Sequence, residues 1–390
     1  MPTAMKGWGT VGSTLIVLGA LLTTGLIGGA SAQHRLRGWK TNLRIHSVDL
    51  AEIKSGGPPK DGIPAIDHPT FVSPNKARRW LDGREPVIAV EINGEAKAYP
   101  LQILIWHELV NDVIGGVPVA VTFCPLCHSA IAFDRRLEGR VYDFGVSGLL
   151  RYSDMIMYDR QTESWWQQAI GEAIVGDLTG KRLKQLPSQI VSFKDFVAAH
   201  PEGKVLSRNT GYHRRYGQNP YVGYDRITSR PFLYDGPKDD RLRPMERVVV
   251  VSLNGKHKAY PYAITSKRHV IHDRIGDQEI VIFHAPGTLS ALDRERIVAS
   301  RDVGATGVFI PRLGERHLTF DYQRGWFVDR ETSSRWNILG RCVEGSLKGE
   351  RLEPVVHGDY FAFAWLAFRP DTEIYRTPVK VSSQKRRRRL

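Results

Sequence analysis

Cysteine is scarce in this chain: only Cys124, Cys127 and Cys342 occur among 390 residues. So low a cysteine content excludes a small scaffold held together by many disulfides. The odd number also leaves at least one thiol without a disulfide partner inside the chain. The cysteines therefore raise a question of chemistry, namely whether they are free thiols, metal ligands or redox groups.

Several familiar signatures of chemistry are also missing. The sequence has no nucleophile elbow, no phosphate-binding P-loop and no HExxH zinc motif. Hydrophobic residues make up 42% of the chain and charged residues 25%, which excludes a disordered chain and a polytopic membrane protein. The length allows two globular domains, and no motif identifies a reaction.

The first 32 residues are predicted to be a signal peptide or an N-terminal anchor. Lys6 precedes an uncharged apolar stretch that ends in Ala30, Ser31 and Ala32, the small-residue pattern of a signal-peptidase site. The stretch is also about long enough to span a bilayer. Both interpretations predict an exported protein, which is periplasmic, extracellular or anchored to the outer face of the cytoplasmic membrane.

Positive charge gathers at the C-terminus. The formal net charge is +14, of which residues 381–390 and Lys6 supply six charges, so that about +8 is spread over the rest. Without another basic cluster, we expect no nucleic-acid partner. The N-terminal segment and the basic tail are the places where membrane contact is expected, and the sequence identifies no protein partner.

Two parts of the chain are similar to each other. Residues 85–104 and 246–265 are identical at ten of twenty positions, without a gap. The likeness continues in "YDRQTESWW" against "VDRETSSRW" and in "GEAIVGDLTGKRL" against "GRCVEGSLKGERL". Repetition at this spacing predicts two tandem copies of a domain-sized unit rather than a short solenoid repeat.

The predicted organisation follows from this repetition. We expect, in chain order, a signal peptide or anchor (1–32), a linker (33–61), a first copy with the cysteine pair (62–205), a loop rich in Arg and Tyr (206–240), a second copy without the pair (241–380) and a basic tail (381–390). The long loop is expected to cover a site.

The predicted fold class is β-rich α+β, with the two hairpin-rich copies packed as a pseudo-symmetric pair. Asn93 with Gly94, and Asn254 with Gly255, supply the positive φ angles of tight hairpin turns between β-rich runs. A further turn is expected at Glu138. Only short helices are expected, one from Pro74 and one from Lys194.

The cysteine pair belongs to one copy only. Aligning Phe123 with Phe283 places Cys124 opposite His284, so the second copy lacks the pair although it keeps the surrounding pattern. The pair is therefore not needed for folding, which favours a functional role. Cys342 aligns with Ala173, a small apolar position, and is expected to be a buried hydrophobe.

Four interpretations of "CPLCH" differ in what they need from its surroundings. With His128, the letters match a haem attachment site, but no second axial ligand is evident and haem is not favoured. A thioredoxin-like dithiol needs a helix after the motif, whereas the residues from Ser129 alternate like a strand. A local structural disulfide needs nothing more.

A metal site suits the local pattern best. Two thiolates three residues apart, turned by Pro125, can chelate one ion, and His107 is the nearest additional ligand. Thiolates with imidazole suit copper or zinc. Trp106, Glu108, His128 and Ser129 are candidates for the surrounding shell, and further carboxylates lie nearby in sequence: Asp112, Asp134, Asp143, Asp154 and Asp159. A thiol–disulfide oxidoreductase and a non-catalytic scaffold with a local disulfide remain the alternatives.

A family resemblance rests on longer motifs. The segments "GIPAIDHPTFVS", "EPVIAVEINGEAKAYPLQIL", "WHELVND", "GGVPVAVTFCPLCHSAIAFDR", "FGVSGLLRYSDMIMYDRQTESWWQQ" and "FAWLAFRPDTEIY" resemble the prokaryotic domain of unknown function numbered 3179, over about residues 62–375. The resemblance implies that the CPLC and WHE stretches are hallmarks. It implies no activity. In this family Asn or Gly is more usual after the second cysteine, so His128 departs from the pattern.

Overall fold

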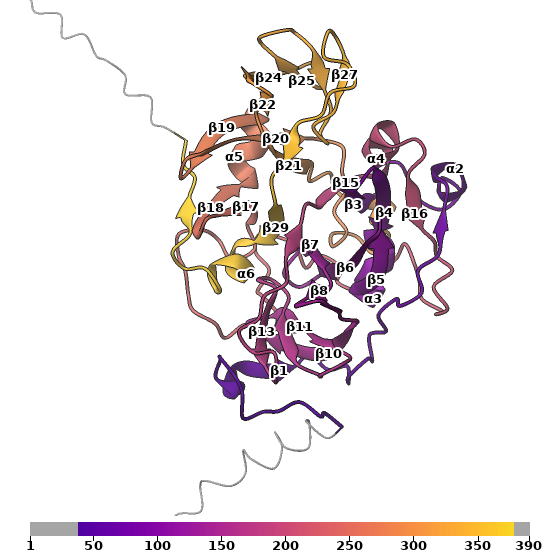
Figure 1. The fold of residues 1–390 in the computed structure, drawn as a ribbon, viewed down its shortest axis with the longest axis vertical. Coiled ribbons are helices and arrows are strands. Elements are labelled where there is room, and N and C mark those ends of the chain that lie inside the picture. Colours follow the sequence, from indigo (N-terminus) through magenta and orange to yellow (C-terminus); the bar gives the residue numbers. More distant parts are fainter. Residues whose placement is uncertain (1–37, 378–390) are drawn as a thin grey trace, which may run out of the picture. The chain divides into compact units, whose positions relative to one another are not determined.

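The computed structural model describes residues 38–377, which contain many strands and few helices (Figure 1). Strands account for 41% and helices for 11%, as the β-rich prediction requires. Residues 40–377 lie within one compact unit. The predicted signal peptide or anchor and the basic tail lie outside the described residues. Among residues 38–377, no helix is long and apolar enough to cross a membrane.

The sheet at the start of the first half is built on a tight hairpin. Strands β3 (Pro86–Ile92) and β4 (Glu95–Pro100) are joined at Asn93 and Gly94, with φ angles of 49° and 81°. These are the angles that the Asn-Gly pair predicts. The full order is β15-β3-β4-β16-β2, the outer strands being β15 (Gln189–Ser192), β16 (Lys204–Leu206) and β2 (Phe71–Val72).

A short helix leads from this sheet to the next. Helix α3 (Leu101–His107) buries nearly all its side chains, and the chain then enters β5 (Leu109–Ile114). The second sheet has the order β14-β7-β6-β5, with β6 (Val117–Cys124), β7 (Ser129–Asp134) and β14 (Gln185–Leu186). The cysteine turn joins β6 to β7, at the end of this sheet.

A third sheet has the order β1-β10-β11-β12-β13. Its strands are β1 (Ile53–Ser55), β10 (Phe144–Arg151), β11 (Asp154–Asp159), β12 (Trp165–Gln167) and β13 (Glu172–Val175). Strand β1 lies in the segment expected to be a linker and pairs with β10. The turn expected at Glu138 is present between β8 (Arg136–Leu137) and β9 (Arg140–Val141).

The second half has sheets of similar order. One is β29-β17-β18-β30, and another is β19-β20-β21-β28. Their strands are β17 (Arg247–Leu253), β18 (Lys256–Pro261), β19 (Val270–Ile275), β20 (Gln278–Ala285), β21 (Ala305–Ile310), β28 (Glu353–Pro354), β29 (His357–Phe361) and β30 (Glu373–Ile374). Helix α5 (Tyr262–Arg268) connects β18 to β19, as α3 connects β4 to β5.

The remaining elements are small. The second half also has the sheet β24-β25-β26-β27 and the pair β22-β23. Their bounds are β22 (Arg312–Leu313), β23 (Arg316–His317), β24 (Phe320–Gln323), β25 (Trp326–Asp329), β26 (Arg335–Trp336) and β27 (Cys342–Glu344). The other helices are η1 (Leu50–Glu52), α2 (Pro74–Ala77), α4 (Phe193–Ala199), η2 (Ile297–Ala299) and α6 (Ala362–Leu366).

Backbone hydrogen bonds correct the residue-level alignment of the cysteine strand. The Phe123 amide donates to the Glu108 carbonyl over 2.8 Å, and the His284 amide donates to the His269 carbonyl over 2.8 Å. Phe123 is therefore level with His284, one position from the predicted Phe283. The prediction that Cys124 lies opposite His284 is therefore wrong by one residue. The β5–β6 and β19–β20 hairpins have matching registers, so aligning the two halves requires no gap between these strands.

The hydrophobic core joins the two halves. One cluster combines Phe123, Cys124 and Met157 with Val248 and Phe361. The Phe361 amide donates to the Cys127 carbonyl over 2.9 Å, so the second half supports the cysteine turn directly. Cys342 is buried in a separate apolar cluster, in agreement with its predicted role as a small hydrophobe.

Candidate metal centre

The two cysteines flank a tight turn. Strand β6 ends at Cys124 and β7 begins at Ser129, while the Cys127 amide donates to the Cys124 carbonyl over 3.2 Å. Cys124 is 1% exposed and Cys127 is 0% exposed, and the two form no disulfide. A strand rather than a helix follows the motif, as predicted, so the helix that activates a thioredoxin-like dithiol is missing from its usual place after the second cysteine.

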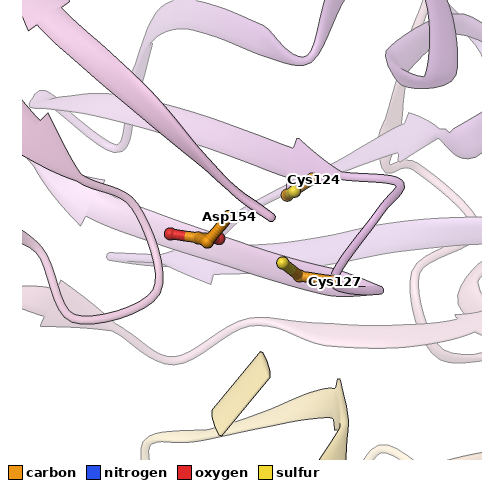
Figure 2. Close-up of side chains that lie close together, drawn as sticks. All are labelled: Cys124, Cys127 and Asp154. Atoms are coloured by element: carbon orange, nitrogen blue, oxygen red, sulfur yellow. The ribbon is translucent and has the colours of Figure 1, made fainter. Parts of the chain in front are cut away.

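A third candidate ligand comes from another sheet. Asp154 is the first residue of β11, directly after a turn in which Tyr152 and Ser153 have φ angles of 51° and 69°. Its carboxylate and the two sulfur atoms lie within 4.8 Å of one another. Figure 2 shows the three side chains converging on one point. The sequence placed Asp154 only in a list of nearby carboxylates, because nothing local distinguishes it from the others.

The two carboxylate oxygens of Asp154 differ in their hydrogen bonds. Its Oδ2 accepts hydrogen bonds from the Ala169 amide, at 2.9 Å, and from Gln167 Nε2, at 2.6 Å. Its Oδ1 is buried without a hydrogen-bond partner in the part of the chain that the structure describes. Burial raises the pKa of Asp154 to about 6, against the opposing effect of these two donors and of the two neighbouring cysteine thiols. Apart from these thiols, no group in residues 38–377 engages Oδ1.

Burial also decides the state of the thiols. It raises the pKa of Cys124 and raises that of Cys127 further, and the neighbouring Asp154 carboxylate adds to both shifts. The Cys127 thiol donates to the Ser153 carbonyl over 3.5 Å. Both cysteines are therefore protonated at neutral pH unless a cation replaces their protons.

Glu108 adds a fourth buried acid. It follows the last residue of α3 with a φ angle of 59°, and it is 7% exposed. Burial and the charge of Asp154 raise its pKa to about 8. Within residues 38–377 its carboxyl makes no hydrogen bond, although its charge acts on Cys124. The Glu108 carboxyl lines a cavity of about 250 Å³, so it faces open space rather than the closed core.

His107 is not a member of this group. Its Nδ1 hydrogen-bonds the Pro64 carbonyl at 2.8 Å, and its Nε2 lies 2.7 Å from the Tyr216 hydroxyl. With Nδ1 donating, the neutral ring accepts from Tyr216 at Nε2, so both nitrogens are engaged. The structure thus gives Asp154 the place that the sequence gave to His107. The physical reason is that Pro64 and Tyr216 hold both ring nitrogens of His107, whereas Asp154 at the start of β11 lies beside the thiols.

The other residues that were predicted to surround the metal make hydrogen bonds to other parts of the protein. Trp106 Nε1 donates to the Gln218 carbonyl at 3.1 Å, and Ser129 Oγ donates to Gln168 Oε1 at 2.7 Å. His128 Nε2 accepts from Arg247 Nη1 at 2.5 Å. Of the predicted shell, Glu108 is therefore the residue whose charge reaches both Cys124 and Asp154.

A comparison with protein families decides the relationship of this chain. The model of the family described as "Protein of unknown function (DUF3179)" matches residues 60–372. The chain belongs to the DUF3179 family. The resemblance inferred from the motifs is confirmed, and in this DUF3179 protein the CPLC stretch supplies both thiols. No curated protein and no solved structure matches the chain.

Proposed function

We propose that this DUF3179 protein binds one copper or zinc ion through Cys124, Cys127 and Asp154. The observation that carries the proposal is the convergence of two buried thiols and one buried carboxylate within 4.8 Å, with an oxygen of Asp154 left without a partner. Thiolates select soft and borderline metals, and a carboxylate is an accepted third ligand for zinc.

The electrostatics support a cation at this point. Four acidic groups, including Glu108, are buried together, and burial raises the pKa of each. Without a cation, such groups avoid the cost of buried charge by keeping their protons. A divalent ion replaces protons on the thiols and the carboxylate, so binding releases protons and strengthens as pH rises.

The ligand count indicates an open site. Structural zinc sites are closed by four protein ligands, whereas catalytic sites keep one position for water or substrate. Cys124, Cys127 and Asp154 supply three. The charge of Glu108 acts on both Asp154 and Cys124, so a cation held by the three ligands would also stabilise this nearby acid.

A thiol–disulfide oxidoreductase is the second candidate, because the same two thiols lie side by side. Such enzymes depend on a thiol whose pKa is lowered by a helix or a neighbouring cation. Here burial and acidic neighbours raise both pKa values. The site therefore favours metal ligation over thiol exchange.

The wider setting of the proposal is an exported protein of two related halves. Export is proposed from the apolar segment that ends in Ala30, Ser31 and Ala32. A duplication is supported by local agreement between the halves: α3 and α5 both have seven residues, and the residues that follow them, Glu108 and His269, have φ angles of 59° and 60°.

The test is metal analysis of protein purified from the exported fraction. We expect one copper or zinc ion per chain in the wild type, and less than a tenth of that in the Cys124→Ser/Cys127→Ser variant. Cys342→Ser is the matched control and should keep the ion, because Cys342 lies in a different cluster. Absence of an ion from fresh and from reconstituted wild-type protein would overturn the proposal. Turnover of a disulfide substrate by metal-free protein would favour the oxidoreductase instead.

A further inference from the structure

A cavity of about 250 Å³ lies beside the cysteine and aspartate group. Its lining is largely apolar: Ile63, Leu126, Val146, Leu149, Leu150, Met155, Tyr221, Tyr224 and Phe232, with Glu108 as the one charged side chain. Cavities that combine an apolar wall with few polar groups are typical binding sites for small molecules.

Neighbouring residues connect the cavity to the thiols. Leu126 lies between the two cysteines in the turn, and Met155 follows Asp154 in β11. Burial raises the pKa of Tyr221, and the charges of Glu108 and Cys124 act in the same direction. The wall of the cavity is thus within electrostatic range of the proposed metal ligands.

A strand irregularity shapes one wall. The pairing of β10 with β11 shifts between Val146 and Leu149, and Gly148 has a φ angle of 74°. A Cβ atom at Gly148 would lie 2.1 Å from the Pro58 carbonyl oxygen, so only glycine allows this close approach. Bulges next to binding sites commonly redirect side chains. Here the bulge brings residues 56–58 against β10 and completes the wall.

Aromatic residues from the Arg- and Tyr-rich loop form the opposite wall. Tyr221, Tyr224 and Phe232 lie between β16 and β17 in the chain, and Phe232 is 46% exposed although it lines the cavity. Leu233 beside it is 41% exposed. The mouth of the cavity is therefore apolar as well.

We propose that this cavity binds a small apolar alcohol, with its ring or chain against Tyr221, Tyr224 and Phe232 and its hydroxyl on the Glu108 carboxyl. The volume suits a molecule of about ten non-hydrogen atoms. A hydroxyl can donate to or accept from the Glu108 carboxyl in either protonation state, and Glu108 is the one charged residue of the lining. The proposal goes beyond the proposed metal function and does not depend on it.

Benzyl alcohol and toluene are the probes, titrated by calorimetry and ligand-observed NMR into the full chain. We expect both to bind the metal-loaded wild type saturably, with benzyl alcohol at least tenfold tighter. Glu108→Gln should weaken benzyl alcohol about tenfold and leave toluene unchanged. Equal affinity for the two probes in the metal-loaded wild type would overturn the hydroxyl assignment.

Two tryptophan variants test the cavity itself. Ile63→Trp fills it from a half-buried loop position and should abolish binding of both probes while the ion is kept. Ile264→Trp makes the same change at a half-buried position of α5 and should bind as the wild type does. Wild-type toluene binding in Ile63→Trp would overturn the cavity proposal. The Cys124→Ser/Cys127→Ser variant should bind toluene without a metal, so failure of the metal proposal is distinguishable.

Discussion

The turn between β6 and β7 differs sharply from the connection between β20 and β21. Residues 125–128 suffice for the first, and they bring Cys124 and Cys127 together. The second runs through residues 286–304 and contains the short helix η2. Before the two turns, β6 pairs antiparallel with β5, and β20 pairs antiparallel with β19 in the same way. Similar sheets thus carry a ligand pair in one half and a long loop in the other.

The hairpins that follow show the same contrast. Phe144 pairs with Asp159 at the base of β10 and β11, as Phe320 pairs with Asp329 at the base of β24 and β25. The first hairpin is longer, and Asp154 stands at its tip. The second ends at Arg324. The site therefore depends on extensions beyond a shared base, which explains how one half can lack it and still fold.

Substitution at the two hairpin tips should give the largest difference. Asp154→Ala removes a proposed ligand and should weaken metal binding about a thousandfold, or ~4 kcal/mol, whereas Arg324→Ala should change it less than twofold. Competition with a chromophoric chelator measures both. Equal affinities for the two variants would show that the longer hairpin supplies no ligand.

The stability of the metal-free protein should depend on pH. The folded-state pKa values of Glu108 and Asp154, about 8 and about 6, lie above the ordinary values of 4.5 and 3.8. The folded protein thus keeps protons that the unfolded chain releases, so stability is full below about pH 4 and falls as pH rises to about 8. We expect a loss of several kcal/mol in urea unfolding, at about 1.4 kcal/mol for each pH unit that separates a folded-state pKa from its ordinary value.

Two changes should sharpen this result. Glu108→Gln removes the group with the higher pKa and should flatten the profile, and a bound metal should reverse its slope because the ligands then lose their protons. A metal-free wild type that gains stability between pH 5 and 8 would contradict the assigned buried acids.

Substitutions at the bases of the two hairpins should lower the stability of the protein by similar amounts but differ in their effect on metal binding. Asp159 accepts from Trp166 Nε1 at 3.0 Å, and Asp329 accepts from Trp336 Nε1 at 2.9 Å. Both carboxylates are fully buried, so replacing either with Ala should cost about 2–3 kcal/mol in unfolding free energy. Only Asp159→Ala should also weaken metal binding, about tenfold, because β11 carries Asp154. If Asp159→Ala left the metal affinity unchanged, the base of the hairpin would have no influence on the metal site at its tip.

The smallest effect is expected at Cys342. It packs in an apolar cluster and aligns with Ala173, so Cys342→Ala should lower the unfolding free energy by about 1 kcal/mol and leave metal content unchanged. Loss of the ion would show that the second half contributes to the site.

The sequence by itself determined the local structures. Asn93 with Gly94 specifies a tight turn through its positive φ angles, and the CPLC pair follows a strand whose apolar pattern is evident. Such features depend on neighbouring residues only. The sequence alone was therefore enough to propose the cysteine pair as a candidate site and Glu108 as a residue near it.

Tertiary structure decided which residues complete the site. Asp154 reaches the thiols because the β10–β11 hairpin folds back beside the cysteine turn, and several carboxylates in the same stretch look alike in sequence. His107 lies outside the group because Pro64 and Tyr216 engage both of its ring nitrogens. Long-range strand pairing therefore places Asp154, the proposed third ligand, beside the thiols, and a short motif does not record such pairing.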